Sequence, residues 1–135
     1  MFFVQHARRQ RLLGVVTQHR HGRMLNIHPS LLPAYGGINT HARALRDGVK
    51  IHGCTVHFVA SDLDHGPIII QAAVPVLRHD TEQTLAARVL HEEHRIYPQA
   101  VRWLCQGQIE LSKQGQVVFN YRKQSGLTLV SPGLE

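Results

Sequence analysis

The sequence predicts an α/β fold with one long helix and a terminal β-hairpin. Three observations lead to this prediction. Short runs of strand-forming residues alternate with helical segments along the chain. A helical pattern of apolar residues continues through most of the second half. Two short strand-like runs, 108–111 and 117–121, then flank a polar segment whose Gly115 favours a tight turn.

The first part of the chain predicts a strand, an irregular loop and a short helix. Residues 23–27 form a compact apolar run typical of a buried strand. Pro29 and Pro33 then interrupt regular structure, because proline lacks a backbone N–H donor. Residues 39–47 favour a helix, which Gly48 is expected to end.

The middle of the chain predicts two more strands. Residues 54–60 are rich in β-branched and aromatic side chains. Residues 61–67 have the composition of a loop. Residues 68–76 follow as a strand, and the three consecutive isoleucines at its start predict burial on both faces.

The long helix is predicted to begin at Asp80 or Thr81 and to end at Gly107. Either residue can cap the first turn. Pro98 falls inside the helical pattern and is expected to kink or split it. One mostly apolar stripe of this helix is expected to face the core, namely Leu85, Val89, Glu93, Tyr97, Val101 and Leu104.

Charge and composition narrow the class of partner. The 135-residue chain carries a formal net charge of +6, and no acidic residue precedes Asp47. Such a surface attracts anions, and we expect anionic small molecules rather than nucleic acid, because aromatic residues are only 6% of the chain. No apolar run is long enough to span a membrane. Cys54 and Cys105 are expected to be buried free thiols.

Three polar residues suggest a reactive site. Asn26 and His28 alternate along the first strand and so point to the same face, and Asp64 follows the second strand. A carboxylate can orient an imidazole and favour its charged form, and an amide can donate to an oxygen that gains negative charge. Together they suit acyl transfer to a nucleophile that belongs to the substrate, because no nucleophile motif is present.

Spacing alone leaves simpler interpretations open. An asparagine and an aspartate in turns, with a packed histidine between them, would explain the same residues. His91 and His94 lie three positions apart and could chelate, but no third ligand is placed, so no metal site is predicted. Glu93 lies on the expected core-facing stripe, where an acid needs a partner or a function.

Several segments in order resemble the phosphoribosylglycinamide formyltransferase family, the folate-dependent enzymes of purine synthesis. The similarity runs from about Gly22 to the end of the hairpin. The segments that carry it are Asn-Ile-His-Pro-Ser-Leu-Leu-Pro at 26–33, Gly-Ile-Asn-Thr-His at 37–41, His-Gly-Cys-Thr-Val-His-Phe-Val at 52–59, Leu-Asp-His-Gly-Pro-Ile-Ile-Ile-Gln at 63–71 and Glu-His-Arg-Ile-Tyr-Pro at 93–98.

The resemblance implies a reaction and roles for the three polar residues. The co-substrate 10-formyltetrahydrofolate would give its formyl group to the amino group of glycinamide ribonucleotide. Asn26 would hydrogen-bond the formyl oxygen, and His28 would stabilise the oxyanion. Asp64 would orient His28 and help to move a proton through water.

The resemblance also implies binding residues. Glu93 would bind the ribonucleotide near Pro29. The folate pocket would be lined by Val59, Ala60, Ser61, Asp62, Leu63 and Asp64. The resemblance implies small-molecule partners. We also expect a cytoplasmic location and, from the composition and ligand spacing above, no metal, nucleic acid or membrane.

Two relatives of this family share the same amide, imidazole and aspartate. Methionyl-tRNA formyltransferases usually carry a further tRNA-binding domain, and formyltetrahydrofolate hydrolases tend to have an altered loop after the Asn-Ile-His element. The intact 28–33 segment, with 39–41 behind it, favours the glycinamide enzyme. A formyltetrahydrofolate hydrolase and a non-catalytic folate-binding fragment stay open as alternatives.

The amino end departs from the family pattern. The family's glycine-rich phosphate loop has no counterpart, so the chain resembles the C-terminal half of a Rossmann-like formyltransferase sheet. We expect a divergent basic leader at 1–21, a formyltransferase domain at 22–121 and a tail at 122–135. A mis-assigned start or shifted reading frame is favoured over a transit peptide or a truly divergent leader.

This departure has consequences for activity and assembly. Without the phosphate loop the ribonucleotide loses its main anchor, so we expect weak or no transferase activity from this polypeptide alone. Exposed sheet edges would favour self-association.

Overall fold

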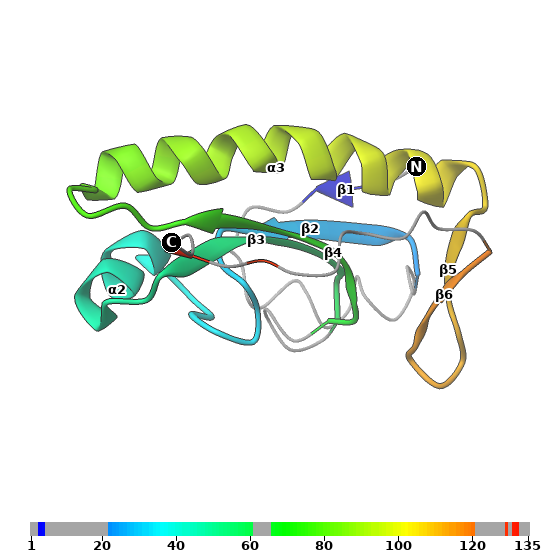
Figure 1. The fold of residues 1–135 in the computed structure, drawn as a ribbon. Helices are drawn as coiled ribbons and strands as arrows, with labels where there is room; N and C mark the ends of the chain where they lie inside the picture. The colour runs from blue at the N-terminus through cyan, green and yellow to red at the C-terminus, as the bar shows by residue number, and fades with distance from the viewer. Residues whose placement is uncertain (1–2, 5–21, 61–65, 121–128, 130, 133–135) are drawn as a thin grey trace.

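The computed structural model describes residues 3–4, 22–60, 66–120, 129 and 131–132. Its strands form a four-stranded sheet, in the order β1-β2-β3-β4, and a separate two-stranded hairpin (Figure 1). The helix and sheet content confirms the predicted α/β class. Among the described residues, no helix is long and apolar enough to cross a membrane. The elements are β1 (Phe3–Val4), β2 (Met24–His28), α2 (Thr40–Asp47), β3 (Ile51–Phe58), β4 (Ile68–Pro75), α3 (Glu82–Cys105), β5 (Ile109–Leu111) and β6 (Val117–Phe119).

The sheet combines parallel and antiparallel pairs. β1 runs parallel to β2, with Phe3 opposite Met24 and Val4 opposite Leu25. β3 lies between β2 and β4 and runs antiparallel to both. Sequence analysis did not predict a strand at Phe3–Val4, which forms one edge of the four-stranded sheet.

The core lies between the sheet and α3, which runs along one face of it (Figure 1). Leu85 and Val89 are buried as predicted, and Ile96 and Ala100 continue the buried stripe. The second half of the predicted stripe is therefore shifted by one residue. Glu93, Tyr97, Val101 and Leu104 are only half-buried.

The predicted second strand was placed too late in the chain. β3 begins at Ile51 and ends at Phe58, whereas 54–60 was expected. Gly53 lies within it because the neighbouring strand passes very close: a Cβ atom there would lie 2.0 Å from the backbone oxygen of Ala72. A glycine within a strand marks this kind of close backbone approach.

The expectation that β4 is buried on both faces was wrong. Ile68 is 40% exposed, and Ile69 is 7% exposed. β4 is the last strand in the order of the four-stranded sheet, and its only neighbour among the described strands is β3. Apolar residues in such an edge strand do not need other elements packed on both faces of the sheet.

Helix α3 begins as predicted but is not split at Pro98. The Thr81 hydroxyl accepts from the backbone N–H of Thr84, and Thr84 bonds back to Thr81, which completes a capping box. The helix continues through Pro98 to Cys105. Pro98 is exposed, and it has no backbone N–H to bond to the carbonyl one turn earlier.

The chain after α3 follows the prediction closely. Gly107 adopts a left-handed conformation (φ 68°) just after the helix, and the hairpin of β5 and β6 follows. The expectation for the two cysteines is half correct, because Cys54 is buried but Cys105 is exposed. Most of the predicted tail at 122–135 lies outside the described residues.

Candidate functional site

The candidate site begins at the end of β2. Asn26 and His28 are both buried, at 7% and 2% exposure. They alternate along the strand and so project to the same face, as the sequence indicates. Asn26 pairs across the sheet with His57, and His28 pairs with Thr55.

The Asn26 carboxamide is held by His57. Its Nδ2 lies 3.4 Å from Nε2 of His57, and Nδ1 of His57 lies 2.9 Å from the backbone oxygen of Phe58. A carbonyl oxygen only accepts, so Nδ1 of His57 carries a hydrogen and donates it. In the neutral ring Nε2 then accepts from Asn26. The Oδ1 atom of Asn26 is buried and has no hydrogen-bond partner among the described residues.

His28 is held by the loop that follows it. Its Nε2 donates to the backbone oxygen of Tyr35 at 2.8 Å. Tyr35 has φ 53°, a left-handed conformation that costs a bulky residue about 1–3 kcal/mol. This strain lies in the residue whose carbonyl holds the imidazole, which is where functional sites concentrate such strain.

Helix α2 keeps Tyr35 in this conformation. The Tyr35 hydroxyl donates to Asp47 at 3.0 Å. The Arg43 guanidinium lies 5.4 Å from the centre of the Tyr35 ring and also donates to the backbone oxygen of Gly36 at 2.6 Å. The ring of His52 meets Tyr35 edge-on, with 6.1 Å between centroids.

The buried Thr55 side chain holds the proline-rich loop, residues 29–33, through hydrogen bonds to its backbone. Its hydroxyl donates to the backbone oxygen of Ser30 at 2.7 Å and accepts from the N–H of Leu32 at 3.1 Å. Gln71 reaches the same hydroxyl at 3.0 Å. Since Thr55 is fully buried, these bonds are shielded from water. The loop therefore keeps one conformation next to His28.

A cavity of about 540 Å³ opens beside this loop. Pro29 and Glu93, both predicted to bind substrate, line it together. Most of its other lining side chains are apolar. The remaining lining residues are Ile27, His41, Ala86, Leu90, His94, Tyr97 and Pro98.

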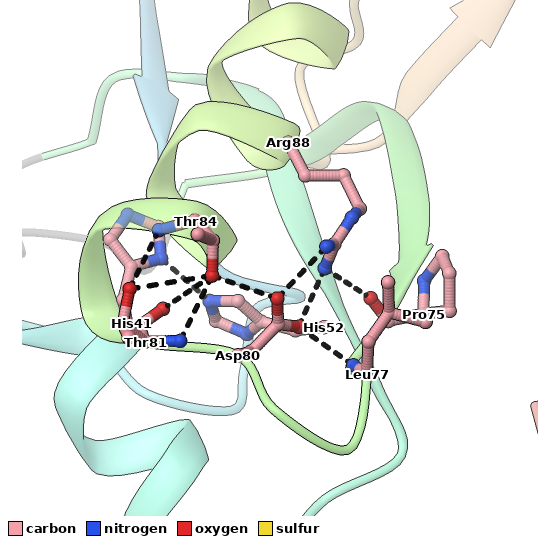
Figure 2. Close-up of polar contacts among 8 residues, drawn as sticks. All are labelled: His41, His52, Pro75, Leu77, Asp80, Thr81, Thr84 and Arg88. Carbon is pink, nitrogen blue, oxygen red and sulfur yellow. Dashed lines mark hydrogen bonds and ion pairs between the residues drawn. The ribbon is translucent and has the colours of Figure 1, made fainter.

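Two further histidines lie between the loop and α3. Nδ1 of His41 is 3.1 Å from Nε2 of His52 (Figure 2). Burial, followed by the nearby His41 and His28, lowers the pKa of His52 to about 4. Burial also lowers the pKa of His41, against the opposing effect of Glu82. Both rings are therefore neutral near pH 7.

The same region contains the start of α3, where Asp80 is the centre of a polar network (Figure 2). Its carboxylate accepts from both guanidinium nitrogens of Arg88, at 2.7 and 2.9 Å, from the Leu77 N–H at 2.7 Å and from Thr84 at 2.9 Å. The Arg88 bond is the main reason why the pKa of Asp80 lies well below its usual range. This network anchors the helix and has no place for a ligand atom.

The structure leaves part of the predicted site open. Asp64, Ser61, Asp62 and Leu63 lie outside the described residues. Val59 and Ala60 are half-buried and follow β3 directly. The predicted catalytic and folate-binding roles therefore stay predictions.

The described residues contain no metal cluster, and the Cys54 thiol is held in its protonated form. No group of three metal-binding side chains occurs in the described part of the chain. His91 contacts Glu92 at 3.1 Å instead. Burial, with Glu93 nearby, raises the pKa of Cys54 to about 12, so its thiol is protonated near pH 7.

Sequence reasoning did not single out His57, Tyr35 or Thr55. A signal existed for Thr55 and His57, because they alternate along β3 as Asn26 and His28 do along β2. No comparable signal marks Tyr35, because its contribution comes from its backbone carbonyl.

The family comparison identifies the class of protein. The formyl transferase family model matches residues 7–101. The chain therefore belongs to the formyl transferase family.

Comparison with individual proteins narrows this class. Phosphoribosylglycinamide formyltransferase of Escherichia coli (strain K12) is 50% identical over 95 residues, covering 70% of this chain and 45% of the relative. The human trifunctional purine biosynthetic protein adenosine-3 is 51% identical over 106 residues, covering 78% of this chain and 10% of that protein.

Solved structures give the same result for the fold. The phosphoribosylglycinamide formyltransferase of Anaplasma phagocytophilum is 47% identical with a TM-score of 0.75, covering 80% of this chain and 53% of that one. A formyltetrahydrofolate deformylase of Pseudomonas syringae pv. tomato is 27% identical with a TM-score of 0.73, covering 78% and 35%. The chain thus spans about half the length of the Anaplasma phagocytophilum structure and about a third of the deformylase structure. It spans less than half of the Escherichia coli relative.

Proposed function

We propose that this chain carries the formyl-transfer site of a phosphoribosylglycinamide formyltransferase. One observation carries the proposal: Asn26 and His28 are both buried in β2, and the residues that follow each of them, Ile27 and Pro29, line a cavity together with Glu93. Relatives at about half identity that bear this enzyme name support the choice of reaction.

The chemistry needs a donor for a developing oxyanion and a carrier for a proton. The amine nitrogen of glycinamide ribonucleotide bonds to the formyl carbon of 10-formyltetrahydrofolate, and the carbon–oxygen π electrons move to oxygen. Asn26 donates to that oxygen, and His28 stabilises its charge. The bond from the formyl carbon to the folate nitrogen then breaks, and the proton lost by the amine passes to that nitrogen, with Asp64 orienting His28.

The cavity suits the amine substrate. The Glu93 carboxylate can accept hydrogen bonds from hydroxyl groups of a ribonucleotide, and mostly apolar side chains line the cavity around it. The formyl donor would lie along Val59, Ala60, Ser61, Asp62, Leu63 and Asp64. No metal has a role in this scheme.

Further proposals concern the setting of the site. Residues 22–121 would form the formyltransferase domain, between a basic leader at 1–21 and a tail at 122–135. The partners would be small molecules rather than nucleic acid or membrane, the location cytoplasmic, and self-association would use the sheet edges at β1 and β4.

A folate-binding fragment without catalysis and a formyltetrahydrofolate hydrolase are the alternative functions. The hydrolase is less favoured, because identity to the deformylase structure is 27%, against 47% for the formyltransferase. Formate release without any amine would identify a hydrolase. Folate binding with no chemistry would identify the binding fragment.

The proposal is tested by binding and transfer together. Glycinamide ribonucleotide is titrated into wild type and Glu93→Gln, and formyl transfer is followed in wild type and His28→Ala. We expect saturable binding that weakens in Glu93→Gln, and slow transfer that His28→Ala removes. Absence of both binding and His28-dependent transfer would contradict the proposal.

A further inference from the structure

A backbone carbonyl of the loop after β2 restrains the His28 imidazole. His28 is 2% exposed, and its Nε2 donates to the backbone oxygen of Tyr35 at 2.8 Å. A carbonyl oxygen only accepts, so this bond places a hydrogen on Nε2. The direction of the carbonyl depends on the backbone angles of Tyr35 and Gly36. The orientation of the imidazole therefore depends on the contacts that hold these two residues.

The loop at Tyr35 needs such contacts to keep its shape. Tyr35 has φ 53°, in the left-handed region that a bulky residue rarely adopts. The next two residues are Gly36 and Gly37, and glycine restricts the backbone less than any other residue. Without contacts from elsewhere, the backbone at Tyr35 would relax to negative φ, and its carbonyl would turn away from His28.

Arg43 supplies these contacts from helix α2. Its Nη1 donates to the backbone oxygen of Gly36 at 2.6 Å and to that of Ile38 at 3.2 Å. The same guanidinium lies 5.4 Å from the centre of the Tyr35 ring, which is within the range of a cation–π interaction. One side chain thus holds the backbone on both sides of Gly37 and also the ring of the strained residue.

Helix α2 gives Arg43 a fixed base. The next residue, Ala44, is 0% exposed, so this turn of the helix packs into the protein. At the start of the helix, the buried Thr40 hydroxyl donates to the backbone oxygen of Pro29 at 2.6 Å. The helix is therefore held against the loop whose conformation Arg43 controls.

We propose that Arg43 is a positioning residue that sets the orientation of the His28 imidazole through the backbone of Tyr35. The inference rests on the proposed formyl transfer, in which His28 stabilises the oxyanion. A planar guanidinium suits this role, because it can donate to carbonyls and stack on a ring together. Arg43 is not among the described residues that line the cavity of about 540 Å³, so it should affect the chemical step rather than ribonucleotide binding.

The first test is spectroscopic and does not depend on turnover. ¹H–¹⁵N spectra of the histidine ring N–H groups compare wild type with Arg43→Gln. In wild type we expect an Nε2–H signal of His28 that the bond to Tyr35 protects from exchange with water. In Arg43→Gln this proton should exchange about tenfold faster, as the loss of one hydrogen bond allows. An unchanged exchange rate in the folded variant overturns the proposal.

The second test separates rate from binding. Single-turnover formyl transfer and the affinity for glycinamide ribonucleotide are measured for the same two proteins. We expect transfer about tenfold slower in Arg43→Gln, with affinity within about twofold of wild type. Unchanged transfer, or a loss confined to affinity, overturns the positioning role. Absence of transfer in wild type, with a His28 signal that still depends on Arg43, would contradict the proposed function and support the positioning.

A second substitution shows whether Arg43 acts through Tyr35. Asparagine adopts the left-handed region more readily than tyrosine does and keeps the same backbone carbonyl. Adding Tyr35→Asn to Arg43→Gln should therefore return the His28 proton exchange and the transfer rate to within about threefold of wild type. A merely structural role of Arg43 would not be relieved in this way, so absence of recovery overturns the proposal.

Two further variants complete the design. Arg43→Lys keeps the charge and serves where Arg43→Gln does not fold. It loses the planar fork, so the His28 proton should exchange about threefold faster than in wild type. Wild-type exchange in folded Arg43→Lys overturns the role of the guanidinium. Lys50→Gln removes an exposed cation just after α2 and is the matched control, which should change neither readout.

Discussion

The start of α3 and the end of β2 use buried polar residues in opposite ways. At the start of α3, Asp80 accepts from Arg88, Leu77 and Thr84, and its side chain is only 3% exposed. At the end of β2, Asn26 is also buried, yet its Oδ1 has no partner among the described residues. The first region satisfies the polar atoms of its carboxylate within the chain, and the second leaves one buried acceptor unpaired.

The backbone shows the same difference. The first turn of α3 is closed by a capping box in which Thr81 has an ordinary extended conformation. The loop after β2 instead keeps Tyr35 at φ 53° in order to place a carbonyl against His28. Complete hydrogen bonding is typical of a structural network, whereas strain and an unpaired acceptor are typical of a site.

The largest effect is expected from breaking the structural network. Asp80→Ala leaves the Arg88 guanidinium without its carboxylate and removes bonds that begin α3, so the free energy of unfolding should fall by about 3 kcal/mol. Urea unfolding measures this change. Histidine ring signals of the β2 region should be unaltered. Glu110→Ala, on the exposed face of β5, should stay within about 0.5 kcal/mol of wild type.

The next effect is expected from Thr55→Val, which breaks the support of the loop. Valine has the same shape but leaves the Ser30 oxygen and the Leu32 N–H without the hydroxyl, so we expect a loss of about 2 kcal/mol. Unlike Asp80→Ala, this change should also shift the ring signals of His28. Unchanged His28 signals in a folded variant would show that the loop is not positioned through Thr55.

A smaller effect is expected from pH, through the histidine pair. The folded pKa of His52 is about 4, below its ordinary value of 6.5, so the unfolded chain binds the proton first. The contribution of His52 is complete above pH 6.5 and is lost as the pH falls toward 4. Between pH 7.5 and 5.5 wild type should lose about 1.3 kcal/mol more than His52→Gln, as measured by urea unfolding. An equal loss in both proteins contradicts this assignment.

The smallest effect is expected on the exposed surface of α3. Arg95 contacts Glu92 at 3.0 Å, but its side chain is 68% exposed, so solvent screens the pair. Arg95→Ala should change the free energy of unfolding by less than about 0.5 kcal/mol in thermal or urea unfolding. A loss above about 1 kcal/mol would contradict the expectation that solvent screens this exposed pair.

The sequence predicted which helices and strands form better than it predicted where each begins and how far each is buried. The helix of α3 follows from its capping residues and apolar period, and the strand of Asn26 follows from its compact apolar run. The start of β3 was missed because Gly53 is required by the nearby Ala72 backbone, a contact that only the folded sheet contains. The exposure of Ile68 depends on its place at a sheet edge, which periodicity does not encode.

The residues of the candidate site likewise fall into those that the sequence predicted and those that it did not. Asn26 and His28 were found because alternate strand residues share a face, and Pro29 and Glu93 were paired by family resemblance before the cavity brought them together. His57 and Tyr35 were missed because their roles depend on a ring tautomer and a backbone carbonyl. Such features arise from tertiary contacts rather than from residue type.

Single-turnover formyl transfer tests the central claim most directly. The chain is used in excess over 10-formyltetrahydrofolate, with saturating glycinamide ribonucleotide, and wild type is compared with His28→Ala at matched folded fraction. We predict slow transfer by wild type that falls at least about a hundredfold in His28→Ala. A wild-type rate no higher than that of His28→Ala would contradict the account.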